Sequence, residues 1–346
     1  MKRLLKLVAR WEVLLLLLII GGGIWSWTLS SYFLQTSNIL DVATPYVFMG
    51  MMALGLTFVV IAGEIDISVA STMTVVAVVI AQVWNAGVNI WAAALIGLLV
   101  AAALGLFNGL LVGVLNLPSL AITLGTLAAY RGLAYVILGG NARSGFPTSF
   151  TNIGGGYVSN ELPVALLVIV GFAIVLGVLL HATRFGRYVF TLGSNKEAAR
   201  FSGVPVARMR VTVFALSGVM AGCAGIIYLG YFGSIQADAA SGSELINVVT
   251  AVVLGGVDIF GGSGTMVGVF LAFILVAVLR NGMGLANIAG PAQDIVVGCL
   301  LVGAILAGNI LRAVQAGTLS RARLRRPRKE VAQTEIQPVE MSSTQT

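Results

Sequence analysis

The chain has 346 residues, of which 58% are hydrophobic and only 10% are charged. A soluble domain carries roughly 25% Asp, Glu, Lys and Arg, because its surface needs that many polar groups. The composition therefore excludes an ordinary soluble protein and leaves no room for a large soluble catalytic domain. It predicts instead a protein that crosses a lipid bilayer about ten times, at about 20 apolar residues per helix.

Ten apolar runs follow one another along the chain, and we expect each of them to be a helix. They cover residues 13–30, 44–62, 68–86, 91–115, 118–138, 163–181, 212–231, 245–258, 264–281 and 292–311. The eighth run is short, which predicts a short or broken helix. The expected fold class is therefore an all-α polytopic membrane protein, with a transmembrane domain over residues 1–312.

The basic residues indicate the orientation of the chain. All but three of the 20 Lys and Arg residues lie before the first run, in the loop 182–212, or after the tenth run. Basic loops stay on the cytoplasmic side, and six and then four spans separate the three blocks. Both termini are therefore predicted to be cytoplasmic. The net charge of +7 is interpreted as topology and lipid contact, not nucleic-acid binding, and residues 313–346 as a disordered basic tail.

Two patterns concern the packing of the helices. Small residues recur every four positions in the fourth run, at Gly97, Ala101, Gly105, Gly109 and Gly113, and they predict close contact with another helix. In both the fourth and the ninth run, an Asn-Gly pair lies the same number of residues before a proline. An inverted repeat of five helices would produce this echo. A second similarity between two motifs has a different offset and does not fit such a repeat. The sequence therefore leaves open whether the chain contains an inverted repeat.

The sequence offers no catalytic constellation. It has no phosphate-binding G-x-x-x-x-G-K-[ST] motif, no H-E-x-x-H and no G-x-S-x-G. Its two cysteines lie in apolar runs and it has a single histidine, so no metal site and no cofactor are expected. We therefore expect no enzyme activity and no ATP hydrolysis in this chain.

The loop 182–212 has the signals of a short helix. Ser194 and Glu197 have the spacing of a capping box, Gly203 suits a left-handed stop, and Pro205 prevents continuation. The expected helix covers about 195–202. From the residues alone, it fits either a groove on a partner protein or the surface of the lipid.

Five motifs occur in the same order as in a known family, and the resemblance extends over about residues 10–312. They are Gly63-Glu-Ile-Asp-Ile-Ser68, Asn108-Gly with Pro118 and Ile122-Thr-Leu-Gly-Thr, Arg131-Gly, Gly193-Ser-Asn-Lys-Glu-Ala-Ala-Arg-Phe-Ser-Gly203, and Gly255-Gly-Val-Asp-Ile-Phe-Gly-Gly-Ser-Gly264. The chain resembles the permease subunits of ribose-type ABC sugar importers, closest in wording to the autoinducer-2 and rhamnose branch.

The resemblance implies a bacterial inner-membrane protein with several partners: a second permease subunit, cytoplasmic ATPase subunits and a periplasmic sugar-binding protein. The loop helix then resembles the helix that couples the permease to the ATPase. Its residues are Ser194, Asn195, Lys196, Glu197, Ala198, Ala199, Arg200, Phe201 and Gly203. The motif residues with an expected structural role are Gly63, Asp66, Ser68, Gly255, Gly256, Asp258, Gly261, Gly262 and Gly264.

Polar residues inside the spans are the candidates for a translocation path, because each is costly there unless it is paired or wetted. They are Asn108, Thr123, Arg131, Gln236, Asn281 and Asp294. Asp294 is a candidate partner for Arg131, in a structural pair or along the path. Asp66 and Asp258 are expected to cap the helices that follow them.

Two hypotheses for the function follow. The first is an ABC importer permease that provides the path for a sugar or a sugar-like solute, driven by ATP hydrolysis in partner subunits. The alternative is a proton- or sodium-coupled secondary transporter of a small neutral solute. The two differ in their source of energy.

Overall fold

The computed structural model describes residues 11–139, 141–158, 161–239 and 242–306, and the structural statements below concern these residues. The predicted basic tail lies outside them, as does the N-terminal basic block. The described chain is built almost entirely of helices.

The described part of the first half contains six α-helices and two short 3-10 helices. They are α2 (Trp11–Leu29), η1 (Ser31–Leu34), α3 (Thr36–Asp41), η2 (Thr44–Tyr46), α4 (Val47–Ile61), α5 (Val69–Asn85), α6 (Ile90–Gly113) and α7 (Ser119–Leu138). The helices of the second half are α8 (Thr148–Gly155), α9 (Val164–Ala182), α10 (Arg184–Ser194), α11 (Lys196–Phe201), α12 (Val206–Phe232), α13 (Gly242–Leu254), α14 (Met266–Leu285) and the apolar helix Gly290–Leu306.

Two antiparallel pairs of two-residue strands complete the fold. β1 (Arg143–Ser144) pairs with β4 (Ser234–Ile235), and Arg143 lies opposite Ile235. β2 (Tyr157–Val158) pairs with β3 (Leu162–Pro163). Both pairs belong to the connections between long helices.

Among the described residues, seven helical segments are long and apolar enough to cross a membrane: α2, α3 with α4, α6, α7, α9, α12 and α14. Three shorter apolar helices, α5, α13 and Gly290–Leu306, account for the remaining predicted runs. The all-α polytopic fold class is thus confirmed, and the eighth run is a short helix as expected. α12 begins at Val206, six residues before the predicted start, because its first turns contain Arg208 and Arg210, which mask the apolar pattern.

The fourth predicted run packs as its small residues indicated. α6 lies along α12, and a side chain at Gly105 would meet the backbone oxygen of Phe214 at 2.6 Å. On α12, Gly218 in turn lies against the backbone of Ala101 and Gly105. The two backbones can approach this closely only because both helices carry small residues at the contact.

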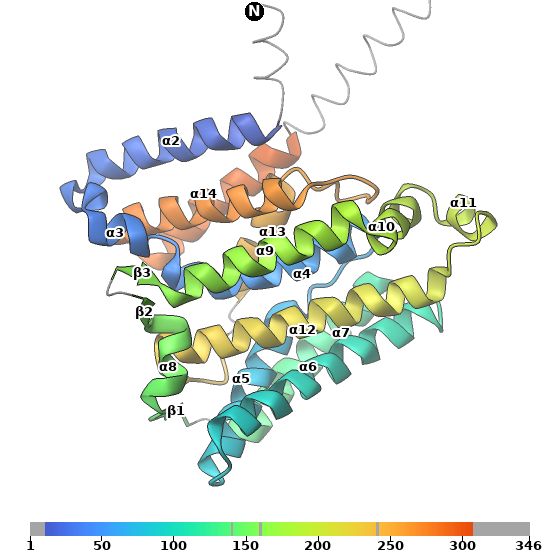
Figure 1. Cartoon of the computed structure of the whole chain (residues 1–346), viewed down its shortest axis with the longest axis horizontal. Helices are drawn as coiled ribbons and strands as arrows, with labels where there is room; N and C mark the ends of the chain where they lie inside the picture. Colours follow the sequence, from blue (N-terminus) through green and yellow to red (C-terminus); the bar gives the residue numbers. More distant parts are fainter. Residues whose placement is uncertain (1–10, 140, 159–160, 240–241, 307–346) are drawn as a thin grey trace, which may run out of the picture. The chain divides into compact units, whose positions relative to one another are not determined.

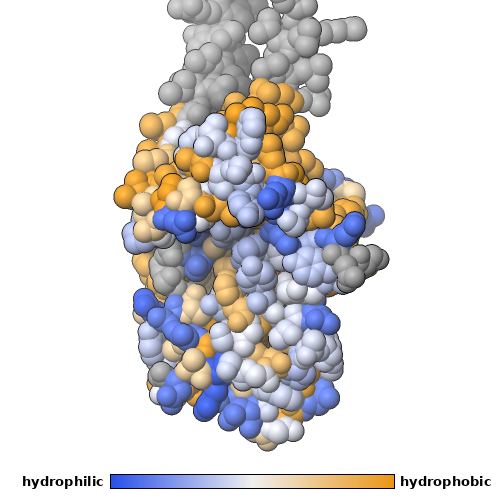
Figure 2. All heavy atoms as spheres, turned by 90° about the vertical axis from the view of Figure 1, so that its left-hand side faces the viewer, coloured by the Kyte–Doolittle hydropathy of each residue, from blue (hydrophilic) through white to orange (hydrophobic). Residues whose placement is uncertain are grey.

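The long helices run across the view of Figure 1, with α2 and α14 side by side and α12 next to α6. Connections gather at the two ends of these helices. One end carries α3, α8 and the short strands, and much of its surface is hydrophilic (Figure 2). The other end carries α10 and α11 (Figure 1). The ends therefore differ in the elements that they could offer to partners.

Candidate functional site

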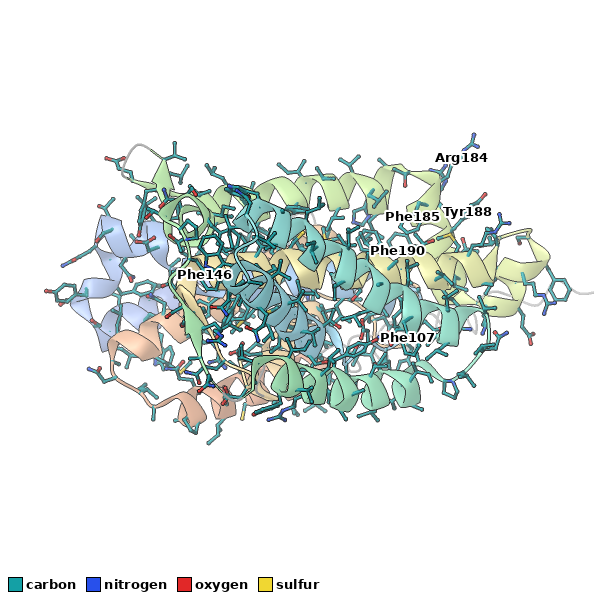
Figure 3. All side chains as sticks on the ribbon, turned by 90° about the horizontal axis from the view of Figure 1, so that it is seen from below. Phe107, Phe146, Arg184, Phe185, Tyr188 and Phe190 are labelled. Atoms are coloured by element: carbon teal, nitrogen blue, oxygen red, sulfur yellow. The ribbon has the colours of Figure 1, made fainter. Side chains whose placement is uncertain are left out.

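The connection between α9 and α12 folds into two helices, of which sequence analysis expected only the second. Thr183 caps α10, because its hydroxyl accepts a hydrogen bond from the amide of Gly186 at 3.3 Å. Phe185 packs against Phe58, and Phe190 packs against His181. In Figure 3 Arg184 points away from the ribbon, so α10 turns an aromatic side toward the helices and a polar side outward.

The cap of α11 corrects the sequence prediction. Asn195, not Ser194, is the N-cap, and its Oδ1 accepts from the amide of Ala198 at 2.9 Å. Ser194 is still the last residue of α10, where its hydroxyl donates to the carbonyl of Phe190 at 2.8 Å. The helix ends at Phe201, and Gly203 has the left-handed φ of +78° that the sequence predicted.

α11 presents an aromatic ring and charges to the outside. Phe201 is 90% exposed, and Lys196, Glu197 and Arg200 are also exposed, whereas Ala199 is buried against the protein. Phe201 thus places a large apolar ring on the outer side of α11, among charged side chains. Phe260, in the turn between α13 and α14, is 81% exposed.

A groove lies beside α11, between this helix, the start of α12 and the end of α6. Its volume is about 820 Å³. It is lined by Gly113, Val114, Asn116, Lys196, Glu197, Arg200, Val204, Pro205, Val206, Ala207 and Arg208. Three of these side chains are basic and one is acidic, so the groove suits a partner with acidic and apolar groups.

Three chain segments pack together where α10 ends, and we call them the loop junction: residues 61–66, 193–195 and 258–264. The amide of Gly262 donates to the carbonyl of Ile61 at 2.8 Å. A Cβ at Gly193 would overlap this same carbonyl, so only glycine fits there. Gly261 touches Gly63, and both have a positive φ. The end of α10 is thereby fixed to the turns after α4 and α13.

The other predicted motif residues take different places around the junction. Asp258 does not cap α14; its Oδ1 accepts from the amide of Phe260 at 3.0 Å, within the turn, and Thr265 is the cap. Seven residues separate Asp258 from the first turn of α14, which is too far for a cap. Gly255 and Gly256 follow α13 and lie against Val269 and Trp11, and Gly264 lies against Val257.

A buried ion pair joins the start of α12 to the turn after α4. Arg210 Nε donates to Glu64 Oε1 at 2.5 Å, and its Nη1 donates to Asn116 Oδ1 at 3.1 Å. The two charged side chains are only 5% and 10% exposed. Because an unpaired charge is costly in such a place, this pair couples α12 to the α4–α5 turn.

A second polar network continues from the same turn. Asp66 accepts from the amide and hydroxyl of Ser68 at 3.0 and 2.6 Å, and from the Ser217 hydroxyl of α12 at 2.9 Å. Asn108 of α6 donates to the Ser68 hydroxyl at 2.9 Å, and the Tyr130 hydroxyl of α7 donates to Asn108 at 3.3 Å.

Burial raises the pKa of Asp66, while the hydrogen bonds from Ser68 and Ser217 lower it. Asp66 does not itself cap α5, whose N-cap is Ser68; it accepts from the amide and hydroxyl of Ser68 and from the Ser217 hydroxyl of α12. The network connects the α4–α5 turn with three helices.

The six candidate path residues do not form one cluster. Asn108 belongs to the network just described, and the Thr123 hydroxyl is bonded to the carbonyls of Ser119 and Ile65. Gln236 and Arg131 are exposed. Asn281 forms a reciprocal amide pair with Asn38, both bonds being 3.0 Å.

The prediction that Asp294 pairs with Arg131 is wrong. Asp294 pairs with Arg280 of α14 at 2.5 Å, and not with Arg131. Arg280 was missed, although a single arginine within an apolar run is itself a signal of a buried partner. Arg131 forms no salt bridge within the described part of the chain.

The fold and the site define a class: a multi-pass membrane protein with a short helix presented at one end of its spans. Residues 38–305 match the family described as branched-chain amino acid transport system / permease component. The chain belongs to this family, whose members are permease components of ABC transporters and not enzymes.

Relatives refine the comparison. The chain is 35% identical to the autoinducer 2 import system permease protein LsrD of Klebsiella pneumoniae over 86% of this chain and 91% of the relative. It is 34% identical to the protein of the same name from Yersinia enterocolitica and 33% identical to that from Yersinia pseudotuberculosis, over 84% of this chain and 89% of each relative. No solved structure matches the chain.

Proposed function

We propose that this chain is the membrane-spanning permease of an ABC importer for a sugar or sugar-like solute of the ribose type, such as autoinducer-2 or rhamnose. It forms the translocation path together with a second permease subunit, identical or related, in the bacterial inner membrane. ATP hydrolysis takes place in cytoplasmic ATPase subunits, and a periplasmic sugar-binding protein delivers the solute.

The observation that carries this proposal is the exposed helix α11, which follows directly on the closely packed loop junction. Phe201 is the ring that inserts into an ATPase groove, and Lys196, Glu197 and Arg200 surround it with charge. This combination of one aromatic anchor and a charged rim is typical of residues that dominate protein interfaces. The family and the LsrD relatives support the same proposal.

The route from α11 to the spans is short. Val204, three residues after the end of α11, is buried, and α12 begins two residues later. Arg210 then connects α12 to the turn after α4, and Ser217 connects it to Asp66. A displacement of α11 by the ATPase is thereby passed to α12 and α4. Such a displacement would shift the balance between states open to each side of the membrane.

The test is uptake by proteoliposomes that contain the permease, its ATPase subunits and its binding protein. Labelled autoinducer-2, D-ribose and L-rhamnose are supplied outside, with ATP inside. We expect ATP-dependent uptake of at least one of the three. We also expect Glu197→Ala and Arg200→Ala to lower uptake per ATP hydrolysed, because both residues lie on the coupling face.

One outcome would contradict the proposal and favour the secondary transporter. It is uptake that a protonophore abolishes while ATP stays high, and that does not depend on the ATPase subunits. Parental uptake by both α11 variants would overturn the coupling role of that helix alone.

A further inference from the structure

A groove between α9 and α14 opens to the outside of the helix bundle, and we call it the α9–α14 groove. Its volume is about 460 Å³, and it runs from Val170 to Ala182 on α9 beside Met266, Val267 and Phe270 of α14. All but one of its lining side chains are apolar. Val267 is 60% exposed, so the groove faces whatever surrounds the spans. In a membrane this is the hydrocarbon of the lipid.

The length of the α9–α14 groove matches one leaflet of a bilayer. At about 1.5 Å per residue, α9 rises by about 18 Å from Val170 to Ala182. The hydrocarbon core of a bilayer is about 30 Å thick, so each leaflet contributes about 15 Å. Ala182 is also the last residue of α9, so the groove starts where this span ends and reaches past the middle of the helix. An extended acyl chain of the same leaflet fits along it.

The one polar side chain that lines the groove lies at the end of α9. It is His181, whose Nε2 accepts from the amide of Met266 at 3.2 Å. Because Nε2 accepts, the neutral ring carries its proton on Nδ1. Nδ1 makes no hydrogen bond within the described part of the chain. This end of the groove can therefore donate a hydrogen bond to a ligand.

Two arginines follow at the same end. Arg184 and Arg187 belong to the first turn of α10, which begins two residues after Ala182, and both are exposed. Neither forms a salt bridge among the described residues, and Arg184 points away from the ribbon (Figure 3). The Glu12 carboxylate of α2 is already bonded to the hydroxyl of Thr265, the residue before α14, at 3.2 Å. With two guanidinium groups and one carboxylate, the net charge of these residues is positive.

An apolar groove that ends in donors and positive charge is complementary to an anionic phospholipid. The phosphodiester carries a negative charge and only accepts hydrogen bonds, which suits guanidinium groups and an imidazole N–H. A zwitterionic headgroup would add an ammonium group next to the arginines, where it is repelled. A helix of a second permease subunit would fill the apolar part, but would not by itself supply an acceptor for these donors.

We propose that the α9–α14 groove binds one anionic phospholipid of the leaflet on the α10 side. An acyl chain lies along the groove, and the phosphate accepts from Arg184, Arg187 and Nδ1 of His181. The lipid is a resident ligand and not the transported solute, so this inference goes beyond the proposed function and does not depend on it. Because the lipid contacts both α9 and α14, its binding stabilises the folded protein.

The test measures lipid retention by the full-length protein. The protein is purified in mild detergent and transferred to mixed micelles with equal amounts of dioleoyl phosphatidylglycerol and dioleoyl phosphatidylcholine. The acyl chains are the same, so a difference in retention reports on the headgroup. Native mass spectrometry counts the lipids that stay bound. We expect wild type to retain one phosphatidylglycerol in preference to phosphatidylcholine, and phosphatidylglycerol to raise the unfolding temperature more.

Two matched pairs of variants locate the site. Val178→Trp fills the groove, whereas the control Val175→Trp changes a residue of the same helix that does not line it; the two valines are 55% and 63% exposed. Val178→Trp should lower the retention of both lipids about tenfold, and Val175→Trp should not.

The second pair concerns the headgroup. The double variant Arg184→Gln with Arg187→Gln should lower the preference for phosphatidylglycerol about tenfold, as expected for lost hydrogen bonds to a charged group. The control Arg208→Gln removes an exposed arginine at the start of α12, which does not line this groove, and should keep the preference.

Three results would overturn the inference. They are equal retention of the two lipids by wild type, equal retention by Val178→Trp and Val175→Trp, and loss of a second copy of the chain instead of a lipid from Val178→Trp. If Val178→Trp does not fold, Ile174→Trp replaces it, because Ile174 also lines the groove and is 62% exposed. Retention is measured without solute or ATP, so failure of the transport assay would leave this inference standing.

Discussion

The buried pair between Arg210 and Glu64 gives the sharpest prediction of stability. Arg210→Met removes a guanidinium whose side chain is 5% exposed, and leaves the 10% exposed Glu64 carboxylate without its partner. Breaking a buried pair from one side typically costs about 3–5 kcal/mol, mainly through the charge that remains. The hydrogen bond from Arg210 to Asn116 is lost as well. We therefore expect the free energy of unfolding to fall by about 3–5 kcal/mol.

The same reasoning predicts the outcome of a double-mutant cycle. Glu64→Gln keeps an oxygen for Arg210 Nε but removes the charge, and the double variant Glu64→Gln with Arg210→Met contains no unpaired charge. Its destabilisation should be smaller than the sum of the two single effects, by about 0.5–3 kcal/mol. The measurement is reversible unfolding of the purified protein in mixed micelles, followed by circular dichroism. A cost below about 1 kcal/mol for Arg210→Met, with additive effects, would refute the account of this pair.

Three further predictions concern the loop junction, α11 and the polar network. Gly193→Ala should lower the free energy of unfolding by about 1–3 kcal/mol and impair uptake, because its Cβ would overlap the Ile61 carbonyl. The control Gly171→Ala has open space around it and should unfold like wild type. Equal unfolding of the two variants would contradict the close packing of the loop junction. Asn195→Ala should lower the stability by about 0.5–2 kcal/mol because the cap of α11 is lost, whereas Asn195→Ser should retain most of the wild-type stability. Calorimetry of wild type and both variants measures this difference. An Asn195→Ala protein as stable as wild type would contradict the role of the cap. Asn108→Leu should cost about 1–3 kcal/mol by leaving the hydroxyls of Ser68 and Tyr130 with fewer partners, as thermal unfolding would show; no loss of stability would mean that the network contributes little.

The sequence was informative where a feature depends on neighbours along the chain. The spacing of Gly97, Ala101, Gly105, Gly109 and Gly113 predicted a close helix contact, because a period of four residues places all of them on one side of a helix. The length of apolar runs predicted the spans for the same reason. Gly203 and Pro205 also located the end of α11, since their backbone preferences act locally.

The sequence was less informative where a feature depends on residues far apart. Glu64 and Arg210 are 146 residues apart, and their pairing follows from the packing of α12 against the α4–α5 turn. The partner of Asp294 was wrong because depth in the membrane does not determine which helices are adjacent. α10 was missed because its polar and aromatic residues alternate in a pattern that apolar runs do not reveal. Asn195 and not Ser194 caps α11 because Ser194 is the last residue of α10.

The central claim is that α11 docks on an ATPase subunit, and site-specific cross-linking tests it most directly. A photoreactive amino acid is placed at Phe201, and in a separate protein at Tyr157, an exposed residue at the opposite end of the spans. The permease is co-expressed with its ATPase and binding protein, and membranes are irradiated. We predict a cross-link to the ATPase from position 201 and none from position 157. Absence of an ATPase cross-link at 201 in membranes that show ATP-dependent uptake, or its appearance at 157 instead, would contradict the account.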